Sequence, residues 1–337
     1  MESMGCCERC GISAQRRRTP SDTRQVARGA LHSKYTLYRR STPDRQEAFQ
    51  LQDLTNRFKE YCRSRGADLV GIASIDRFDG VPPEHHPRSI FPETRSIIVL
   101  GKRIARGCLR GIEEGTQFAI YAQYAGNWVP DRFLALTTVS VAQFLEDRRW
   151  EAVPLPCLPV QAPPMGIPVR PDAPTPNVML DFDEAAVRAG LGRFGLSGEF
   201  MTPQFGPRQQ LQIILTDAVL QPDPFCETVV CDECGECISA CPLDAMNVSQ
   251  PETRIVCGMA MKTARVDWGA CRSCRNGAFP NRAHPTGTPD RTAALCVRTC
   301  VHHVEKTGLV ANTFERPFRQ RPAWRVDKTG AAGIVEG

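Results

Sequence analysis

The sequence lacks a long hydrophobic run and is poor in histidine. No stretch of about 18 consecutive apolar residues occurs in the 337 residues, so we expect no membrane-spanning helix. The N-terminus has no apolar signal core, and no hydrophobic segment follows the three arginines from Arg16 to Arg18. We therefore expect a cytoplasmic protein. The formal net charge is +5 and there are 6 histidines, a balance that neither requires nor excludes a nucleic-acid partner.

Cysteine, by contrast, is abundant. The chain has 16 cysteines, and nine of them lie between Cys231 and Cys300. Such crowding in a protein of reducing compartments indicates metal ligation rather than disulfides. A hydrophobic content of 42% and a charged content of 23% predict a globular fold with a real core. The length is enough for two domains or for one large domain with an insert.

The densest cysteine stretch runs from Cys231 to Pro242 and reads C-x2-C-x2-C-x3-C-P. This is the spacing of bacterial ferredoxins, in which three thiolates hold one iron–sulfur cluster and the fourth, here Cys241, reaches a second. Pro242 suits the first turn of a helix, which needs no N–H from it. The alternative is a zinc ribbon, but its C-x2-C pairs are usually separated by a longer spacer.

The periodicity of the remaining chain predicts a mixed α/β (α+β) fold. Residues 1–45 are polar and basic, so we expect a disordered or loosely attached segment, and its three cysteines have no fourth partner nearby. Apolar residues at three- and four-residue steps predict a helix over 44–65. The other expected elements are helices at 118–124, 133–150 and 181–190, and strands at 67–73, 96–101, 151–156 and 212–217. The three cysteines are Cys6, Cys7 and Cys10.

Two loops stand out between these elements. The proline-rich connector 154–176 is a long loop, and such loops often line a ligand or act as a lid. Glycines at Gly190, Gly192 and Gly195 allow the backbone to approach a ligand closely, which makes them candidate cofactor-binding residues. His85 and His86, in another proline-rich loop, could bind a metal, although a solvated loop is the alternative.

Four segments together resemble one protein family. The stretches 67–73, 189–195, 202–208 and 215–217 are similar to the core of epoxyqueuosine reductases and corrinoid reductive dehalogenases, and the cysteine run follows at the separation that this family uses. The likeness covers roughly residues 50–310. It implies a nitroreductase-like α/β core over 46–222, a ferredoxin-like module with two 4Fe-4S clusters over 223–312, and a basic tail over 313–337.

The resemblance also implies cofactors and partners. They are two 4Fe-4S clusters, a base-off corrinoid (cobalamin), an external low-potential electron donor of the ferredoxin or flavodoxin type, and a small organic or nucleoside substrate. The sequence has no D-x-H-x-x-G stretch, which suits base-off binding and equally suits a protein without a corrinoid. A tRNA substrate is less favoured, because tRNA-acting relatives often carry a C-terminal helical extension. The alternative function is electron transfer by the clusters without a corrinoid.

Ligands can be assigned by the crossed pattern of two-cluster ferredoxins. Cluster one would take Cys231, Cys234, Cys237 and Cys300. Cluster two would take Cys241, Cys257 and Cys296, the spacing of Cys257 being the family's. Ala293 stands where the family places another cysteine. The fourth ligand of cluster two would then be Cys271 or Cys274; the alternatives are a three-iron cluster or a ligand that is not a thiolate.

Candidate catalytic residues follow from the need for a positioned acid beside the metal. Asp181 and Asp183 occupy the region where epoxyqueuosine reductases have such an acid, although N-capping of a helix is the alternative role. Dehalogenases pair a tyrosine with a basic residue, for which Tyr121, Tyr124 and Arg208 are candidates. Core packing and surface charge are the alternative explanations for these three.

Overall fold

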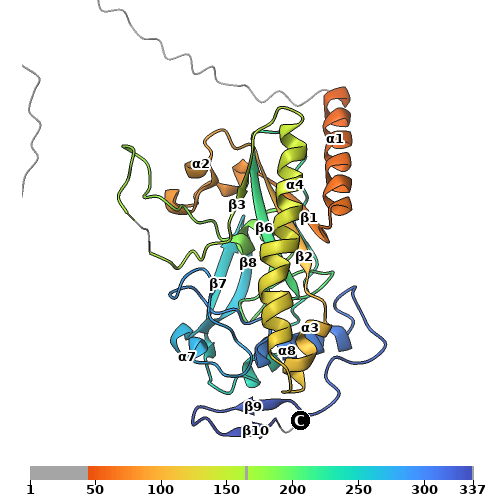
Figure 1. Cartoon of the computed structure of the whole chain (residues 1–337), viewed down its shortest axis with the longest axis vertical. Helices are drawn as coiled ribbons and strands as arrows, with labels where there is room; N and C mark the ends of the chain where they lie inside the picture. The colour runs from red at the N-terminus through yellow and green to blue at the C-terminus, as the bar shows by residue number, and fades with distance from the viewer. Residues whose placement is uncertain (1–44, 164–165, 336–337) are drawn as a thin grey trace, which may run out of the picture. The chain divides into compact units, whose positions relative to one another are not determined.

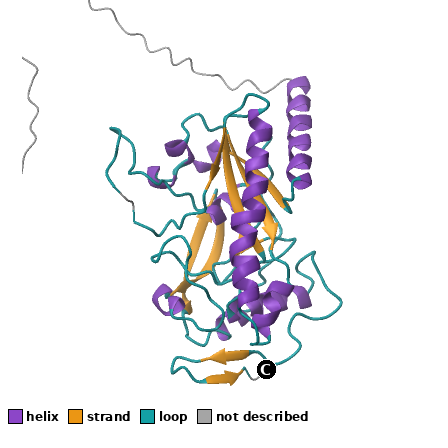
Figure 2. Cartoon of the chain, in the orientation of Figure 1, coloured by secondary structure: helices purple, strands orange, loops and turns teal. Residues whose placement is uncertain are grey.

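A four-stranded antiparallel sheet lies at the centre of the N-terminal half (Figures 1 and 2). Its strand order is β1-β2-β6-β3, and β2 and β6 pair over their whole length, from Ser96 opposite Thr216 to Arg103 opposite Gln209. The strands are β1 (Leu69–Ser74), β2 (Ser96–Arg103), β3 (Ala152–Leu155) and β6 (Gln209–Thr216). All four were expected from their apolar runs, and the predicted mixed fold is confirmed.

This computed structural model describes residues 45–163 and 166–335, and the side chains from residue 51 onward. The expectations for residues 1–44, including those for Cys6, Cys7 and Cys10, lie outside the described residues. Within the described part, no helix has the length and apolar character needed to cross a membrane.

Neighbouring residues of each strand point to opposite sides of the sheet, so each face carries apolar side chains. Both faces are covered by other elements. On one face, Ile98 and Ile214 pack with Phe58 of α1 (Arg45–Ser64) and Val141 of α4 (Ala135–Glu146). On the other face, the core includes α5 (Phe182–Arg188) and two residues of a long hairpin, Val256 and Met261. The hairpin consists of β7 (Met246–Val256) and β8 (Met259–Val266). It comes from the expected C-terminal module and completes the core of the N-terminal sheet.

One long helical segment replaces the two helices expected over 118–124 and 133–150. A π-helix, η3 (Tyr121–Leu134), leads directly into α4 and contains Pro130. A proline removes one backbone donor, and the wider π turn accommodates that loss. The expected break was therefore wrong, and the helical character was right.

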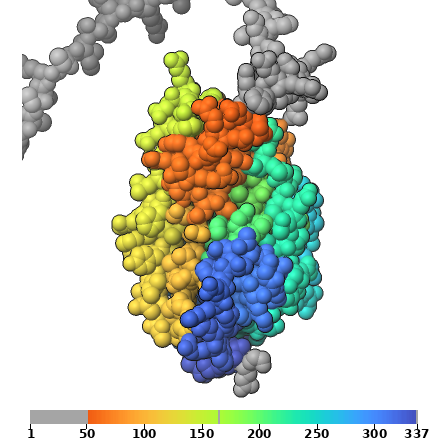
Figure 3. All heavy atoms as spheres, turned by 90° about the vertical axis from the view of Figure 1, so that its right-hand side faces the viewer, coloured from red at the N-terminus to blue at the C-terminus, as the bar shows by residue number. Residues whose placement is uncertain are grey.

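Apart from α8, which has 12 residues, the remaining elements are short. They are the 3-10 turns η1 (Ile75–Phe78) and η2 (Pro83–His85), the helices α2 (Pro87–Ile90), α3 (Gly107–Glu113), α6 (Glu236–Ser239), α7 (Trp268–Arg272) and α8 (Leu295–Lys306), and the strand pairs β4 (Arg193–Phe194) with β5 (Phe200–Met201) and β9 (Trp324–Val326) with β10 (Ala332–Ile334). The space-filling view shows the C-terminal residues, in blue, beside the amber segment near residue 100 (Figure 3). Hydrogen bonds from Arg106 to the Arg316 carbonyl and from Arg110 to the Phe318 carbonyl join the two segments.

Candidate functional site

Four cysteines line one cavity and form the first cysteine group: Cys231, Cys234, Cys237 and Cys300. The first three come from the ferredoxin-like run and the fourth from α8, the combination that the crossed pattern predicts. The backbone N–H of Leu196 donates to the sulfur of Cys231 at 3.3 Å. His303 ties α8 to the loop, because its ring nitrogens lie 2.8 Å from Asp232 Oδ2 and 3.0 Å from Glu236 Oε1.

Four more cysteines line a separate cavity and form the second cysteine group: Cys241, Cys271, Cys274 and Cys296. Two of its sulfurs accept backbone N–H groups at 3.4 Å, Cys241 from Ala245 and Cys274 from Asn276. Cys271 and Cys296 are buried and Cys241 and Cys274 are half-buried; burial raises the pKa of Cys271 to about 11. The structure thus brings both members of the C-x2-C pair to this group, where the sequence led us to expect one.

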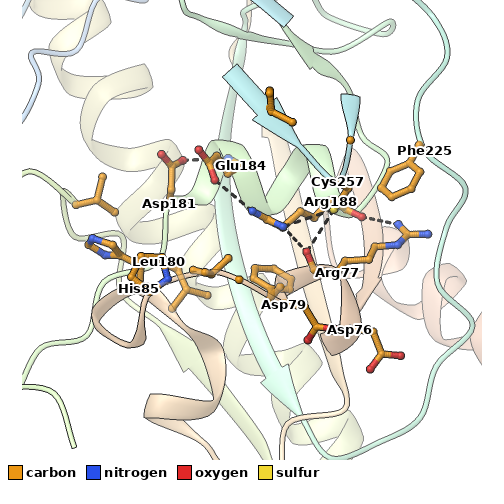
Figure 4. Close-up of a pocket in the computed structure, with 17 residues that line it drawn as sticks. Asp76, Arg77, Asp79, His85, Leu180, Asp181, Glu184, Arg188, Phe225 and Cys257 are labelled. Atoms are coloured by element: carbon orange, nitrogen blue, oxygen red, sulfur yellow. Dashed lines mark hydrogen bonds and ion pairs between the residues drawn. The ribbon is translucent and has the colours of Figure 1, made fainter. Parts of the chain in front are cut away.

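Cys257 does not join the second group, so its assignment as a ligand has no geometric support. It lies in the turn between β7 and β8, with φ at +50°, and lines a different cavity. Its thiol donates to the Arg77 carbonyl at 3.3 Å and lies 3.5 Å from Arg188 Nη1 (Figure 4). The hairpin is the physical reason, because the eleven residues from Met246 to Val256 extend roughly 30 Å as a strand. Met246 lines the second group, and the turn is at the other end.

The spacing of the sulfurs argues against single zinc ions. A tetrahedral site with metal–sulfur bonds of about 2.3 Å places its sulfurs roughly 3.8 Å apart. In the described residues, three potential ligand atoms lie within 4.8 Å of one another only at Asp232, Cys234 and His303. Among the described residues, no three sulfurs of either cysteine group therefore lie as close together as a single zinc ion requires.

Asp181 and Asp183 occupy different positions on α5. The carboxylate of Asp181 accepts the N–H of Glu184 at 2.9 Å and caps the helix, which is the alternative role considered for it. Asp181, Glu184 and Arg188 line the same cavity as Cys257, about 780 Å³ in volume (Figure 4). Asp183 is not among the residues that line this cavity, and no described residue makes a hydrogen bond to its carboxylate.

The pKa of the Asp183 carboxyl group is raised well above its usual value. Asp183 is exposed, and desolvation by the surrounding protein raises its pKa to about 7, with further contributions from Asp181 and Glu199. Cys157 shows the same combination: it is exposed, and burial together with nearby carboxylates, Asp183 first, raises its pKa to about 12.

An ion pair at the second cysteine group also influences the charge of Asp183. Arg291 lines the cavity of that group and pairs with Glu199 at 2.5 Å. Both side chains also act on the charge of Asp183, Glu199 raising its pKa and Arg291 lowering it. Sequence analysis missed Glu199 and Arg291, because a lone glutamate and a lone arginine in loops carry no pattern that predicts a contact.

The other catalytic candidates do not gather around Asp183. Tyr121 is fully buried, and its hydroxyl donates to Asp290 at 2.8 Å. Tyr124 lies on the surface against Trp128. Arg208 is buried and donates to the Ile104 carbonyl at 2.8 Å, in a region described below. These contacts match packing and surface roles better than a shared catalytic site.

The glycines serve close packing of the chain. A Cβ on Gly190, whose φ is +74°, would lie 2.0 Å from the Pro224 carbonyl oxygen, and one on Gly192 would lie equally close to the Met201 carbonyl oxygen. A Cβ on Gly195 would lie 3.4 Å from the sulfur of Cys231. The glycine-rich turn therefore allows the backbone to pack tightly beside the first cysteine group.

His85 and His86, in the proline-rich loop before β2, have hydrogen-bond partners within the protein. A ring nitrogen of His85 lies 2.8 Å from the Met179 carbonyl oxygen, and the His86 ring accepts the N–H of Arg88 at 3.1 Å. These contacts favour the solvated-loop alternative over a metal site.

Comparisons with known proteins give one significant sequence match and several structural ones. No family model matches the chain. A segment of 64 residues is 39% identical to the tetrachloroethene reductive dehalogenase of Sulfurospirillum multivorans, covering 18% of this chain and 13% of that protein.

Among solved structures, an epoxyqueuosine reductase is 18% identical with a TM-score of 0.38, and the alignment covers 57% of this chain and 53% of that one. The enzyme from Streptococcus thermophilus is 16% identical with a TM-score of 0.40, covering 62% and 55%. A catabolic reductive dehalogenase is 15% identical with a TM-score of 0.48, covering 84% and 40%. The chain thus spans about half or less of the length of these proteins. The 39% identical segment confirms the resemblance to reductive dehalogenases that the motifs predicted.

Proposed function

We propose that this protein is an iron–sulfur oxidoreductase that holds two 4Fe-4S clusters, one in each cysteine group. The observation that carries the proposal is the convergence of cysteines from distant parts of the chain into two sets of four, each lining its own cavity. Four thiolates are the usual ligand set of a 4Fe-4S cluster. The sulfur spacing and the backbone N–H donors to Cys231, Cys241 and Cys274 fit such clusters.

The crossed arrangement places the two sites side by side. Cys296 and Cys300 are four residues apart on α8, a rise of about 6 Å, and each serves a different group. Cys237 and Cys241 are also four residues apart, and Cys237 belongs to the first group and Cys241 to the second. Electrons can therefore enter at one cluster and leave from the other within the module.

Asp183 is the residue best placed to supply a proton. Reductive cleavage of a substrate bond consumes protons together with electrons, and an acid works best when its pKa lies near the working pH. Asp183 meets this condition, and Glu199 and Arg291 link it to the second group, which would be the cluster nearer the substrate. The bound clusters supply the electrons, and a corrinoid, which the resemblance implies, would supply the cobalt centre that passes them to the substrate.

The pKa of Asp183 predicts a pH-dependent stability that Asp183→Asn removes. Because the folded-state pKa is raised from 3.8 to about 7, the protonated carboxyl favours the folded state, and this contribution disappears as the pH rises through 7. We expect the melting temperature of Asp183→Asn, relative to the unsubstituted protein, to increase from pH 4 toward pH 7 and then level off. The measurement is thermal unfolding of the cluster-loaded protein under anaerobic conditions.

The matched control is Asp53→Asn, a change of an exposed carboxylate on α1. Its melting temperature should follow the unsubstituted protein at every pH. A pH-independent difference for Asp183→Asn would contradict the raised pKa and remove the support for Asp183 as the acid.

The corrinoid is tested separately by the absorption spectrum. After anaerobic reconstitution with iron, sulfide and cobalamin, followed by removal of unbound cobalamin, we expect corrin bands on top of the broad iron–sulfur shoulder and about one cobalt per chain. Iron–sulfur absorption without cobalt would instead identify an electron-transfer protein that works without a corrinoid. A low-potential ferredoxin or flavodoxin would serve as electron donor in either case.

A further inference from the structure

Four arginines line a cavity that the redox function does not use. The cavity has a volume of about 410 Å³, within the range of small-molecule sites. It lies between the end of β2, α3 and the segment after α8. No acidic side chain is among the lining residues, whereas the cavity beside Cys257 has four. The polar and aromatic lining residues are Arg103, Arg106, Arg110, Arg208, Asn312, Phe314 and Phe318.

Arg208 is a buried arginine that lines this arginine cavity. Its side chain is 1% exposed and donates to the Ile104 carbonyl at 2.8 Å and to Asn312 Oδ1 at 2.9 Å. Glu305, outside the lining, lies 2.8 Å from Arg106 and 3.4 Å from Arg208. Burial lowers the pKa of Arg208; Glu305 opposes this effect, whereas the charges of Arg106 and Arg103 add to it.

The Glu305 carboxylate is therefore shared by the guanidinium groups of Arg106 and Arg208. The two outer arginines have their own acids, Asp68 at 3.7 Å from Arg103 and Glu114 beside Arg110, both outside the cavity lining. An anion in the cavity would be surrounded by four arginines, and no acidic residue lines the cavity. Guanidinium groups bind phosphate oxygens in pairs, which makes phosphate a better match than a halide.

An aromatic ring lies beside the positive charges. Phe314 is 44% exposed, and the guanidinium of Arg106 lies 3.6 Å from its ring centroid. The exposed part of the ring offers a surface for a planar group next to a bound phosphate. We propose that this cavity binds a phosphate-bearing small molecule of nucleotide size, with its phosphates on the arginines and its planar group against Phe314.

Titration calorimetry with inorganic pyrophosphate tests the phosphate site. At constant ionic strength, the cluster-loaded protein should bind one pyrophosphate saturably. The double variant Arg103→Gln with Arg110→Gln should bind at least about tenfold more weakly, because it loses two charged donors. Arg57→Gln, the same change on exposed α1, should bind within about twofold of the unsubstituted protein. Absence of saturable binding, or equal weakening by Arg57→Gln, would overturn the proposal.

Comparing ADP with ribose 5-phosphate tests the planar group. ADP should bind several-fold more tightly than pyrophosphate, and ribose 5-phosphate should not, because only ADP has a base that can stack on an aromatic ring. Phe314→Leu should remove the advantage of ADP and leave pyrophosphate binding unchanged. If ADP has no advantage, or keeps it in Phe314→Leu, the nucleotide assignment is wrong. If ribose 5-phosphate binds as tightly as ADP, the ligand is a sugar phosphate, and the nucleotide assignment fails on that outcome too.

Discussion

Replacing Cys271 and Cys274 together by alanine is expected to remove about half of the iron, from about eight to about four atoms per chain. Both thiols line the second cysteine group, so the double variant keeps only Cys241 and Cys296 there. Two thiolates cannot hold a 4Fe-4S cluster firmly. The first group is untouched and should keep its cluster. Iron and sulfide analysis after anaerobic reconstitution gives the count, and electron paramagnetic resonance of the reduced protein shows which signal is lost.

Cys257→Ser and Cys157→Ala are the matched controls. Cys257 lies at the far end of the β7–β8 hairpin and Cys157 in the proline-rich loop, so each variant should keep about eight iron atoms. Loss of a cluster in Cys257→Ser, with full iron content in the double variant, would restore Cys257 as a ligand, point to a fourth ligand that is not a thiolate, and overturn the assignment made from the structure.

Glu113→Ala should destabilise the protein by about 3–5 kcal/mol, because it leaves a buried charge without its partner. Glu113 is the last residue of α3. Its carboxylate pairs with Arg298 of α8, which is fully buried. Arg319 binds the other carboxylate oxygen at 2.6 Å. Arg298 lies between Cys296 and Cys300 on α8, so both cysteine groups depend on the same anchor. Urea unfolding under anaerobic conditions measures the change in the free energy of unfolding.

The neighbouring residue provides the control. Glu114 pairs with Arg110 and with the exposed Arg321, and Glu114→Ala should cost less than about 1 kcal/mol. Equal losses in the two variants would show that the buried pair with Arg298 contributes nothing special.

The cysteine run carried most of what the sequence could predict about the site. Its spacing defines a local loop, and Cys300, which the crossed pattern assigned to the first group, lines the cavity of that group. The second group could not be assigned from spacing alone. Counting residues from Cys241 to Cys257 gives no sign that the intervening chain forms a hairpin, which moves Cys257 away along one strand. Cys271 and Cys274 return to the second group because α7 follows that hairpin.

In the fold, too, some elements could be predicted from the sequence and others could not. Buried strands such as β2 are continuous apolar runs, so their positions could be predicted. Most of β7 is exposed and polar, and its residues carry no alternation that marks a strand. The two aspartates of α5 illustrate why residue type alone cannot assign a role. Asp181 and Asp183 are both acidic residues at a helix start, and only their surroundings separate a helix cap from a group with a pKa near 7.

Iron and acid-labile sulfide content, measured with the Mössbauer spectrum of the anaerobically reconstituted protein, tests the two-cluster account most directly. The account predicts about eight iron and eight sulfide per chain, with the Mössbauer spectrum of cubane clusters and two interacting paramagnetic centres on reduction. A protein that takes up two zinc ions instead, or that retains only about four iron atoms with a single paramagnetic centre, would contradict it.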